Sequence, residues 1–432
     1  MNISEDLGFS DNPFKTTALD PNEEGIKLLA GRKGEVKRFM RRLYNQPQVV
    51  TVEGFNGVGK SSIVNVGIYE SYIRYIKSGR ESSLFIPCIK TFQIGKDTKS
   101  ANFINSVLIE AAQTISRYKG DLVKLDIKIP KEFSAVEAWL NTTHNKTKQY
   151  SGGIGLIQGG YGEHSEINTS KGFSENGISV LISKCLESIF PNKTKGGIVC
   201  IIDNLEIIDS SNTARQVIEE LRDTMFNVQG LRWIICGSLG IVSSVISSPR
   251  LEGLMHDPIK VDGIDTAFLN ELYKNRVSYF KLRNNYYLPI TVSSFMMLYD
   301  ILRKNIRNTL KYANDFCLWI DDNNLHPSAK DEKENLFIEW INLKCIEYHG
   351  SIKSRIKSQS FKLFRDMLIV GGECSFSDFE VFEVISKNEM RELVKELEAA
   401  GLIVSVVDEN DRRRKSIQIT PKGWFISHHL GV

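Results

Sequence analysis

Residues 49–70 restrict the possible folds of this chain more than any other stretch, and they read VVTVEGFNGVGKSSIVNVGIYE. An apolar run leads into a glycine-rich turn, which is followed by Lys60, Ser61 and apolar residues at helical spacing. A buried strand, a turn and a helix with the spacing G-x-x-x-x-G-K-[ST] are typical of a phosphate-binding P-loop. The stretch therefore predicts an α/β fold in which a strand of a parallel sheet ends at a nucleotide site.

Each part of this loop has a chemical task. The glycines let the backbone turn tightly, so that successive N–H groups converge on phosphate oxygens at the positive end of the next helix. Lys60 supplies a charge for the β- and γ-phosphates, and the Ser61 hydroxyl can ligate Mg²⁺. We expect ATP and Mg²⁺ as cofactors. The predicted nucleotide contacts are Gly54, Asn56, Gly57, Val58, Gly59, Lys60, Ser61 and Ser62.

A P-loop also needs a carboxylate at the end of another strand to hold Mg²⁺, and Asp203 follows the buried run IVCII. Many hydrolytic P-loop enzymes place a glutamate directly after this aspartate, but here that position is Asn204 and the next carboxylate is Glu206. Either Glu206 or Asn204 positions the attacking water, or Glu206 is a solvated loop residue. We therefore expect slow hydrolysis, closer to a switch than to a motor.

The next strand of the pattern, WIICGS, ends in Ser238. A hydroxyl at this edge of a parallel sheet can contact the γ-phosphate or the attacking water. The alternative is an ordinary serine at the end of a strand.

The chain of 432 residues is long enough for two or three domains, and the pattern of apolar and polar residues changes along it. Up to about residue 262, short apolar runs alternate with helical patterns, which predicts a parallel sheet with helices on both faces. Within this part, residues 148–172 or so are rich in Gly and Ser, and we expect an inserted hairpin there. The pattern predicts a helical lid over 263–345 and a winged-helix domain over 346–432.

Composition limits the partners and the compartment. A net charge of +3 gives no overall basic field, so a nucleic acid would have to be bound by local patches. No apolar stretch reaches the roughly 20 residues that span a bilayer. The N-terminus is polar, unlike a signal peptide, and seven cysteines are scattered singly. We expect a cytoplasmic protein with no membrane partner.

The GRKGEV segment, the P-loop, Asp203, Ser238 and the helical lid together resemble the AAA+ and STAND ATPases. The order of elements is most similar to the origin-recognition and archaeal initiator-like branch, in which a winged helix follows the lid. The resemblance implies that Gly31 and Arg32 pack near the adenine and ribose. It also implies that Arg307 approaches the γ-phosphate from the lid, unless Arg307 is an ordinary surface arginine.

The resemblance further implies a role for Arg250, which lies ahead of the last predicted strand. In AAA+ proteins an arginine at this place completes the nucleotide site of the neighbouring subunit. ATP would then drive assembly of a homo-oligomer. The absence of an acidic residue at Asn204 is more similar to the STAND switches than to the unfolding machines.

Basic residues gather in two other places. Residues 26–43, IKLLAGRKGEVKRFMRRL, include Arg38, Arg41 and Arg42, which we interpret as a solvated helix face beside the nucleotide. The predicted wing carries Arg412, Arg413, Arg414 and Lys415, which suit DNA phosphates. The helix that would read the major groove, however, has more acidic than basic residues, which favours packing against protein.

The sequence therefore predicts an ATPase that engages double-stranded DNA under the control of ATP. The main alternative is a STAND-like signalling or antiphage-defence ATPase whose winged helix packs on protein and whose output is a partner effector. A third reading is a plain NTPase that loads another machine.

Overall fold

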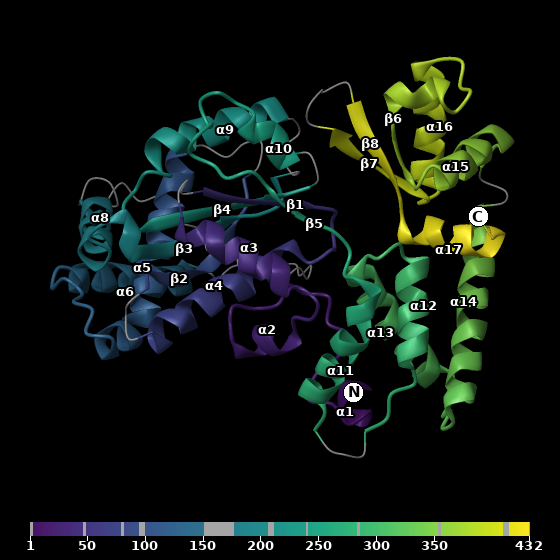
Figure 1. The fold of residues 1–432 in the computed structure, drawn as a ribbon, viewed down its shortest axis with the longest axis horizontal. Helices are drawn as coiled ribbons and strands as arrows, with labels where there is room; N and C mark the ends of the chain where they lie inside the picture. The colour runs from purple at the N-terminus through teal and green to yellow at the C-terminus, as the bar shows by residue number, and fades with distance from the viewer. Residues whose placement is uncertain are drawn as a thin grey trace.

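The structure is a computed structural model that describes residues 3–45, 49–78, 82–94, 100–150, 177–205, 211–238, 241–282, 286–352, 356–408 and 414–431. A sheet with its covering helices forms one part of the molecule, and a group of helices that ends in a small second sheet forms the other part (Figure 1).

The first sheet has five parallel strands in the order β2-β3-β4-β1-β5, which confirms the predicted parallel α/β fold. The strands are β1 (Val49–Gly54), β2 (Leu84–Phe92), β3 (Gly196–Ile202), β4 (Leu231–Gly237) and β5 (Ile259–Val261). β1, β3 and β4 are buried along their whole length, as expected of strands covered on both faces. β4 lies between β1 and β3, so the strand that ends at Asp203 is one strand removed from the P-loop strand.

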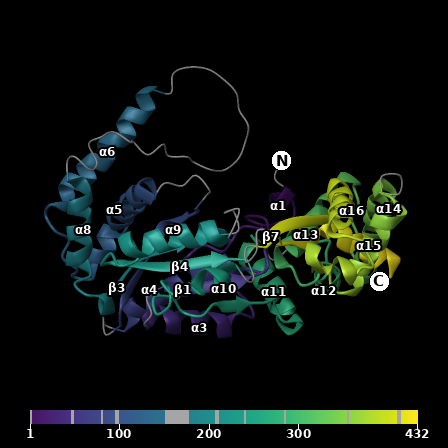
Figure 2. The same cartoon turned by 90° about the horizontal axis from the view of Figure 1, so that it is seen from above.

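Two layers of helices cover this sheet (Figure 2). One layer consists of α3 (Lys33–Tyr44) and α4 (Lys60–Lys77), and the other includes α5 (Ser100–Lys124) and α9 (Ser211–Thr224). α8 (Ile178–Ile189) packs against α5, and α10 (Ile241–Ile246) against α9, in the same core. Successive strand residues face opposite layers. In β2, for example, Leu84 and Ile86 belong to the core under α5, whereas Phe85 belongs to the core under α3 and α4.

α6 (Phe133–Tyr150) packs against α5 and α8 beyond the edge of the sheet. The hairpin expected from about residue 148 therefore overlaps the last turn of α6 at its start. The rest of that expected hairpin lies outside the described residues.

Among the described residues, the predicted lid consists mainly of four helices that share one apolar core, preceded by the short helix η3 (Thr266–Phe268). The four are α11 (Leu269–Phe280), α12 (Val292–Ile301), α13 (Ile306–Asp322) and α14 (Lys330–Ile352). Side-chain caps set two of the starts, because Thr291 accepts from the N–H of Ser294 at α12 and Asn305 from that of Asn308 at α13.

The N-terminal residues join the core of the lid rather than that of the sheet. After α1 (Ile3–Asp6), Phe9 and Phe14 are buried in the lid core, and the N–H of Ser10 donates to the carbonyl of Phe280 at 2.7 Å. The chain then returns to the α/β part through α2 (Glu23–Leu28). The segment before α2 therefore connects the two parts of the molecule.

The C-terminal part, where a winged-helix domain was predicted, combines helices with a small sheet. Its elements are α15 (Ser358–Ile369), β6 (Glu373–Ser375), η4 (Phe376–Glu380), α16 (Lys387–Ala399), β7 (Ile403–Asp408), β8 (Arg414–Ile419) and α17 (Pro421–Leu430). The second helix is a 3₁₀ helix, and β6 adds a third strand to the antiparallel hairpin of β7 and β8. α17 packs on the lid, since Phe425 lies in the lid core and the Cys345 thiol lies 3.1 Å from the Phe425 carbonyl oxygen.

Across the described ranges, no helix combines the length and the apolar character needed to cross a membrane. All seven cysteines are free thiols, and all but Cys88 are buried.

Candidate nucleotide site

The P-loop follows β1 with the backbone that its glycines allow. Gly57 and Gly59 have φ angles of +85° and +101°, in the left-handed region that favours glycine. Gly59 precedes the first residue of α4, so the loop ends at the positive N-terminus of an 18-residue helix. Lys60 is buried, and its ammonium donates to the carbonyls of Gly54 at 2.8 Å and Phe55 at 3.2 Å. The loop thus holds a positive charge across its own turn.

The pair expected to hold Mg²⁺ is assembled. The Ser61 hydroxyl donates to a carboxylate oxygen of Asp203 at 2.7 Å, although the two residues are 142 positions apart. The N–H of Asn204 donates to the other carboxylate oxygen at 2.9 Å, and Asp203 is buried at the end of β3. A hydroxyl and a carboxylate are the oxygen donors that Mg²⁺ prefers, so these residues fit the ion.

Two of the predicted residues follow the ends of neighbouring strands, Asn204 after β3 and Ser238 after β4. Asn204 has a φ of +58°, a conformation that asparagine adopts more readily than most residues. Ser238 follows β4, the strand between β1 and β3, and is half-buried.

The lid touches the P-loop through the first turn of α13. The side-chain amide of Asn305 donates to the Asn56 carbonyl at 2.8 Å, and the N–H of Arg307 donates to the Gly57 carbonyl at 3.1 Å. The same Asn305 caps α13. The side chain of Arg307 is exposed and lines the cleft over the loop, and its approach to the γ-phosphate stays a prediction.

This cleft lies between the P-loop, the lid and the N-terminal segment. Its walls include many residues that the sequence analysis did not single out, namely Thr16, Thr17, Ala18, Leu19, Leu28, Leu29, Ala30, Ile264, Leu272, Arg276, Ile306 and Leu310. Most of the residues at 28–30 and on the lid are apolar, which suits the flat face of a base. The apolar positions of the LLAG run gave a signal for part of this wall, whereas residues 16–19 carry no recognisable motif.

The N-terminal wall is held by specific hydrogen bonds. The N–H of Leu19 donates to the Ser62 hydroxyl at 3.1 Å, and the Asn65 amide donates to the Leu19 carbonyl at 2.9 Å. From the lid, Arg276 donates to the carbonyls of Pro13 at 3.0 Å and Lys15 at 3.2 Å. Arg276 is buried, and burial lowers its pKa to about 10. Ser62, predicted as a nucleotide contact, thus also anchors this wall.

Arg32 lines the cleft and holds the loop in place, whereas Gly31 is not among the lining residues. The buried Arg32 guanidinium donates to the carbonyls of Val58 at 2.9 Å and Asp262 at 2.6 Å, and it pairs with Glu35 at 2.9 Å. It therefore ties the P-loop to the chain after β5. Gly31 has a φ of +68°, and a Cβ there would lie 2.7 Å from that of Phe268, so the position is closed against the lid.

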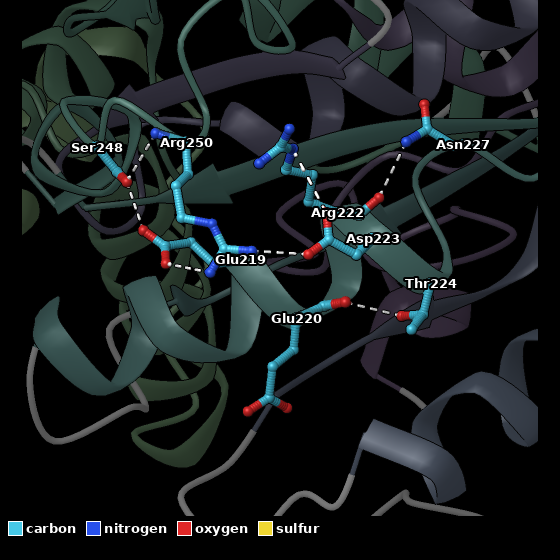
Figure 3. Close-up of polar contacts among 8 residues, drawn as sticks. All are labelled: Glu219, Glu220, Arg222, Asp223, Thr224, Asn227, Ser248 and Arg250. Carbon is cyan, nitrogen blue, oxygen red and sulfur yellow. Dashed lines mark hydrogen bonds and ion pairs between the residues drawn. The ribbon is translucent and has the colours of Figure 1, made fainter.

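Arg250 lies away from this cleft and is engaged within its own chain (Figure 3). Its guanidinium pairs with Glu219 at 3.3 Å and with Asp223 at 2.7 Å, both on α9. The Ser248 hydroxyl also donates to Glu219. The Arg250 side chain is 56% exposed, so its charge faces the surface beside these acids.

Some of the predicted residues fall outside this description. Glu206, Arg412 and Arg413 are not among the described residues. Arg414 and Lys415 begin β8, where their backbones lie opposite Asp408 and Val407 in the antiparallel register with β7.

A five-stranded parallel sheet between two helix layers, with a P-loop after β1, defines an α/β P-loop ATPase fold. No family model matches the sequence, and no curated protein matches it either. Among solved structures, those of origin-recognition proteins align with 94–98% of this chain.

Three of these similar structures illustrate the extent of the likeness. The Aeropyrum pernix ORC1 protein in complex with DNA is 10% identical, with a TM-score of 0.43 over 94% of this chain and 96% of its own. The Aeropyrum pernix ORC2 protein in ADPNP–ADP complexes is 11% identical, with a TM-score of 0.45 over 98% of both chains. Drosophila ORC bound to DNA is 12% identical, with a TM-score of 0.39 over 97% of this chain and 93% of that chain. At sequence identities of 10–12%, the likeness concerns the fold alone.

Proposed function

We propose that this protein is an ATP-binding, slowly hydrolysing ATPase that acts as a nucleotide-dependent switch and engages double-stranded DNA. The observation that carries the proposal is the direct contact between the lid and the P-loop. Asn305 and Arg307, at the start of α13, hydrogen-bond the carbonyls of Asn56 and Gly57. Any phosphate that enters the loop therefore lies next to the lid, and its presence changes what the lid contacts.

The residues of the chain divide the work of binding. The N–H groups after Gly57 and the ammonium of Lys60 bind the phosphates, and the apolar wall accepts the base. Ser61 and Asp203 would hold Mg²⁺, which screens the phosphate charges when it is bound. The positive charge of Arg307 on the lid attracts ATP, which carries the γ-phosphate, more strongly than it attracts the product ADP.

Asn204 supports slow turnover. A carboxylate at this position would polarise the attacking water, whereas a neutral amide can orient water but accepts no proton. Glu206 or Asn204 then positions the water, and Glu206→Gln separates the two. We expect reduced turnover with unchanged ATP affinity in Glu206→Gln; unchanged turnover would leave the role to Asn204.

A route from the lid to the C-terminal part is present in the packing. α14 and α17 are in contact, and Phe425 of α17 is buried in the lid core. A movement of the lid therefore carries the base of the C-terminal part with it. Arg412, Arg413, Arg414 and Lys415 of the predicted wing are the proposed DNA contacts.

A second function, a STAND-like switch with a protein output, is favoured by α16. Its acidic residues are used inside the C-terminal part, since Glu396 accepts from the Ser360 hydroxyl at 2.9 Å and Glu392 pairs with Lys395 at 2.7 Å. A helix whose charged side chains already contact residues of its own domain is suited to packing on a partner protein.

The deciding experiment is equilibrium binding of a fluorescent DNA duplex with ATP and Mg²⁺, with ADP, or without nucleotide. Lys60→Ala and a variant with Arg412, Arg413 and Arg414 changed to Ala are measured beside the unaltered protein. We expect duplex binding that requires ATP and is lost in both variants. If ATP binds and no duplex does at moderate salt, the DNA function is wrong and the protein-output switch takes its place.

A further inference from the structure

A second hollow of the α/β part lies between α3 and α4, on the outer side of that helix layer. The two helices lie side by side (Figure 1), and a Cβ at Gly67 would lie only 2.4 Å from the Phe39 ring, so their backbones approach closely. Outside this contact, the α3–α4 groove extends from Leu29, beside the nucleotide cleft, to Lys195 before β3. A smaller hollow continues it along α4 to Lys77.

The walls of the α3–α4 groove are strongly basic. Its cations, all exposed, are Lys33, Lys37, Arg41, Arg74, Lys77 and Lys195. Within the described part of the chain, none of the six is in an ion pair, in contrast to Lys119 with Glu137 or Lys311 with Asp315. Among the described residues that line it, Glu70 is the one carboxylate. Within that described set, six cations against one acid create a local positive field in a protein whose net charge is only +3.

The spacing of these cations suits a regular row of phosphates. Lys33, Lys37 and Arg41 recur every four residues and so lie on one face of α3, about 6 Å apart along the axis. From Lys33 to Arg41 the row covers roughly 12 Å, which corresponds to three or four phosphates at about 3.4 Å of rise per strand. Arg74 and Lys77 supply charge from the opposite wall.

The groove lacks what a single strand would need. Binding of unpaired bases relies on exposed aromatic rings as stacking platforms. Of the described residues that line the two hollows, Tyr44 is the only aromatic one. Its ring packs edge-on against Phe85 at 4.9 Å, and Arg74 lies over it at 5.7 Å. Contact with the backbone of a duplex, without base stacking, is therefore favoured.

We propose that the α3–α4 groove binds the phosphate backbone of double-stranded DNA, as a contact separate from the wing. The inference rests on the proposed function in one respect, that the protein engages duplex DNA. It assigns a role to the basic residues of α3, which the sequence pattern alone presented as a solvated face. A duplex held in the groove and at the wing would touch both parts of the molecule.

The test measures duplex affinity across a salt series for Lys37→Gln/Arg41→Gln/Arg74→Gln, which leaves the nucleotide cleft intact. Each lost phosphate contact removes about 0.9 from the slope of log K against log salt, so we expect the slope to fall by about 3 and the affinity at least tenfold. The control, Lys128→Gln/Lys131→Gln/Lys184→Gln, changes the net charge equally at exposed sites away from the groove. Glu70→Gln, which removes the carboxylate from the groove, should raise the affinity.

Nucleotide binding and anionic vesicles complete the design. ATP affinity should be unchanged in the groove variant, which shows that the fold and the P-loop are intact. Unchanged duplex affinity and slope in the groove variant would overturn the groove contact while leaving the proposed function in place. If the unaltered protein binds phosphatidylserine vesicles through these residues and binds no duplex, the groove inference and the DNA function both fail, whereas ATP binding still stands.

Discussion

At the scale of single residues, the fold keeps several charges away from water and gives each of them partners. Lys60 rests on two carbonyls, Asp203 accepts from Ser61 and Asn204, and Arg32 is shared between Glu35 and two carbonyls. Without these partners, each buried charge would destabilise the folded state by several kcal/mol. Their partners therefore help to hold the shape of the site.

Glu70 is a half-buried carboxylate on α4, and it leads to a prediction about pH. Burial raises the pKa of its carboxyl above the ordinary value of 4.5. The folded state thus favours the protonated form, and this contribution to stability is present at low pH and is lost as the pH rises through the folded pKa. Glu70→Gln should unfold at a higher temperature than the unaltered protein at pH 7, and the difference should vanish below about pH 4.

Thermal unfolding of both proteins at the two pH values measures this effect. Glu252→Gln, at an exposed position, serves as the control and should change the stability by less than about 0.5 kcal/mol. An equal difference between Glu70→Gln and the unaltered protein at pH 4 and pH 7 would contradict the titration argument.

At the scale of elements, the contact between α13 and the P-loop determines what the switch can sense. Gly57 is central to it, because a Cβ there would lie 2.4 Å from the Asn305 amide oxygen and its φ of +85° suits only glycine well. Every substitution at this position presses directly on the cap of α13.

Gly57→Ala should therefore weaken ATP binding at least tenfold and separate the lid from the loop. The matched control is Gly34→Ala in α3, where an added Cβ meets nothing within 4 Å and alanine suits the helix better. Titration with a fluorescent ATP analogue compares the two variants. Equal affinities would show that the loop tolerates the change and that the lid contact is dispensable.

At the scale of the whole molecule, the N-terminal segment and Arg250 connect parts that are distant in the sequence. Residues 9–14 pack on the lid while Leu19 is held by α4, so this segment bridges the two walls of the cleft. Arg250 reaches the surface beside α9, and its ion pair with Asp223 is of the exposed kind that contributes at most about 1 kcal/mol. Exchanging that pair for a neighbouring subunit's nucleotide would cost little.

If Arg250 completes the site of a neighbour, subunits with different defects should complement each other. Lys60→Ala keeps its own Arg250 but binds no ATP, whereas Arg250→Ala binds ATP without the arginine. We expect each variant alone to have little ATPase activity and a mixture to recover part of it, because some interfaces then have both residues. Turnover measured against the mixing ratio tests this, and a mixture that is only the average of the two variants would restrict Arg250 to its contacts with α9.

The P-loop residues, the position of Asp203 after a buried strand and the parallel sheet followed from the sequence alone. Their signals are local: a spacing of glycines, a run of apolar residues and a period of two or 3.6 each depend on neighbours in the chain. The pairing of Ser61 with Asp203 could be predicted too, because parallel strands bring their ends to one edge of the sheet.

Only the tertiary structure decided which distant segments meet. It placed residues 16–19 on the wall of the cleft, set Arg250 against Glu219 and Asp223, and gathered the cations of α3, α4 and Lys195 into one groove. None of these contacts has a sequence period, because each depends on how whole elements pack and not on the spacing of residues within one of them. For the same reason the basic face of α3 was indistinguishable from a solvated surface until α4 lay beside it.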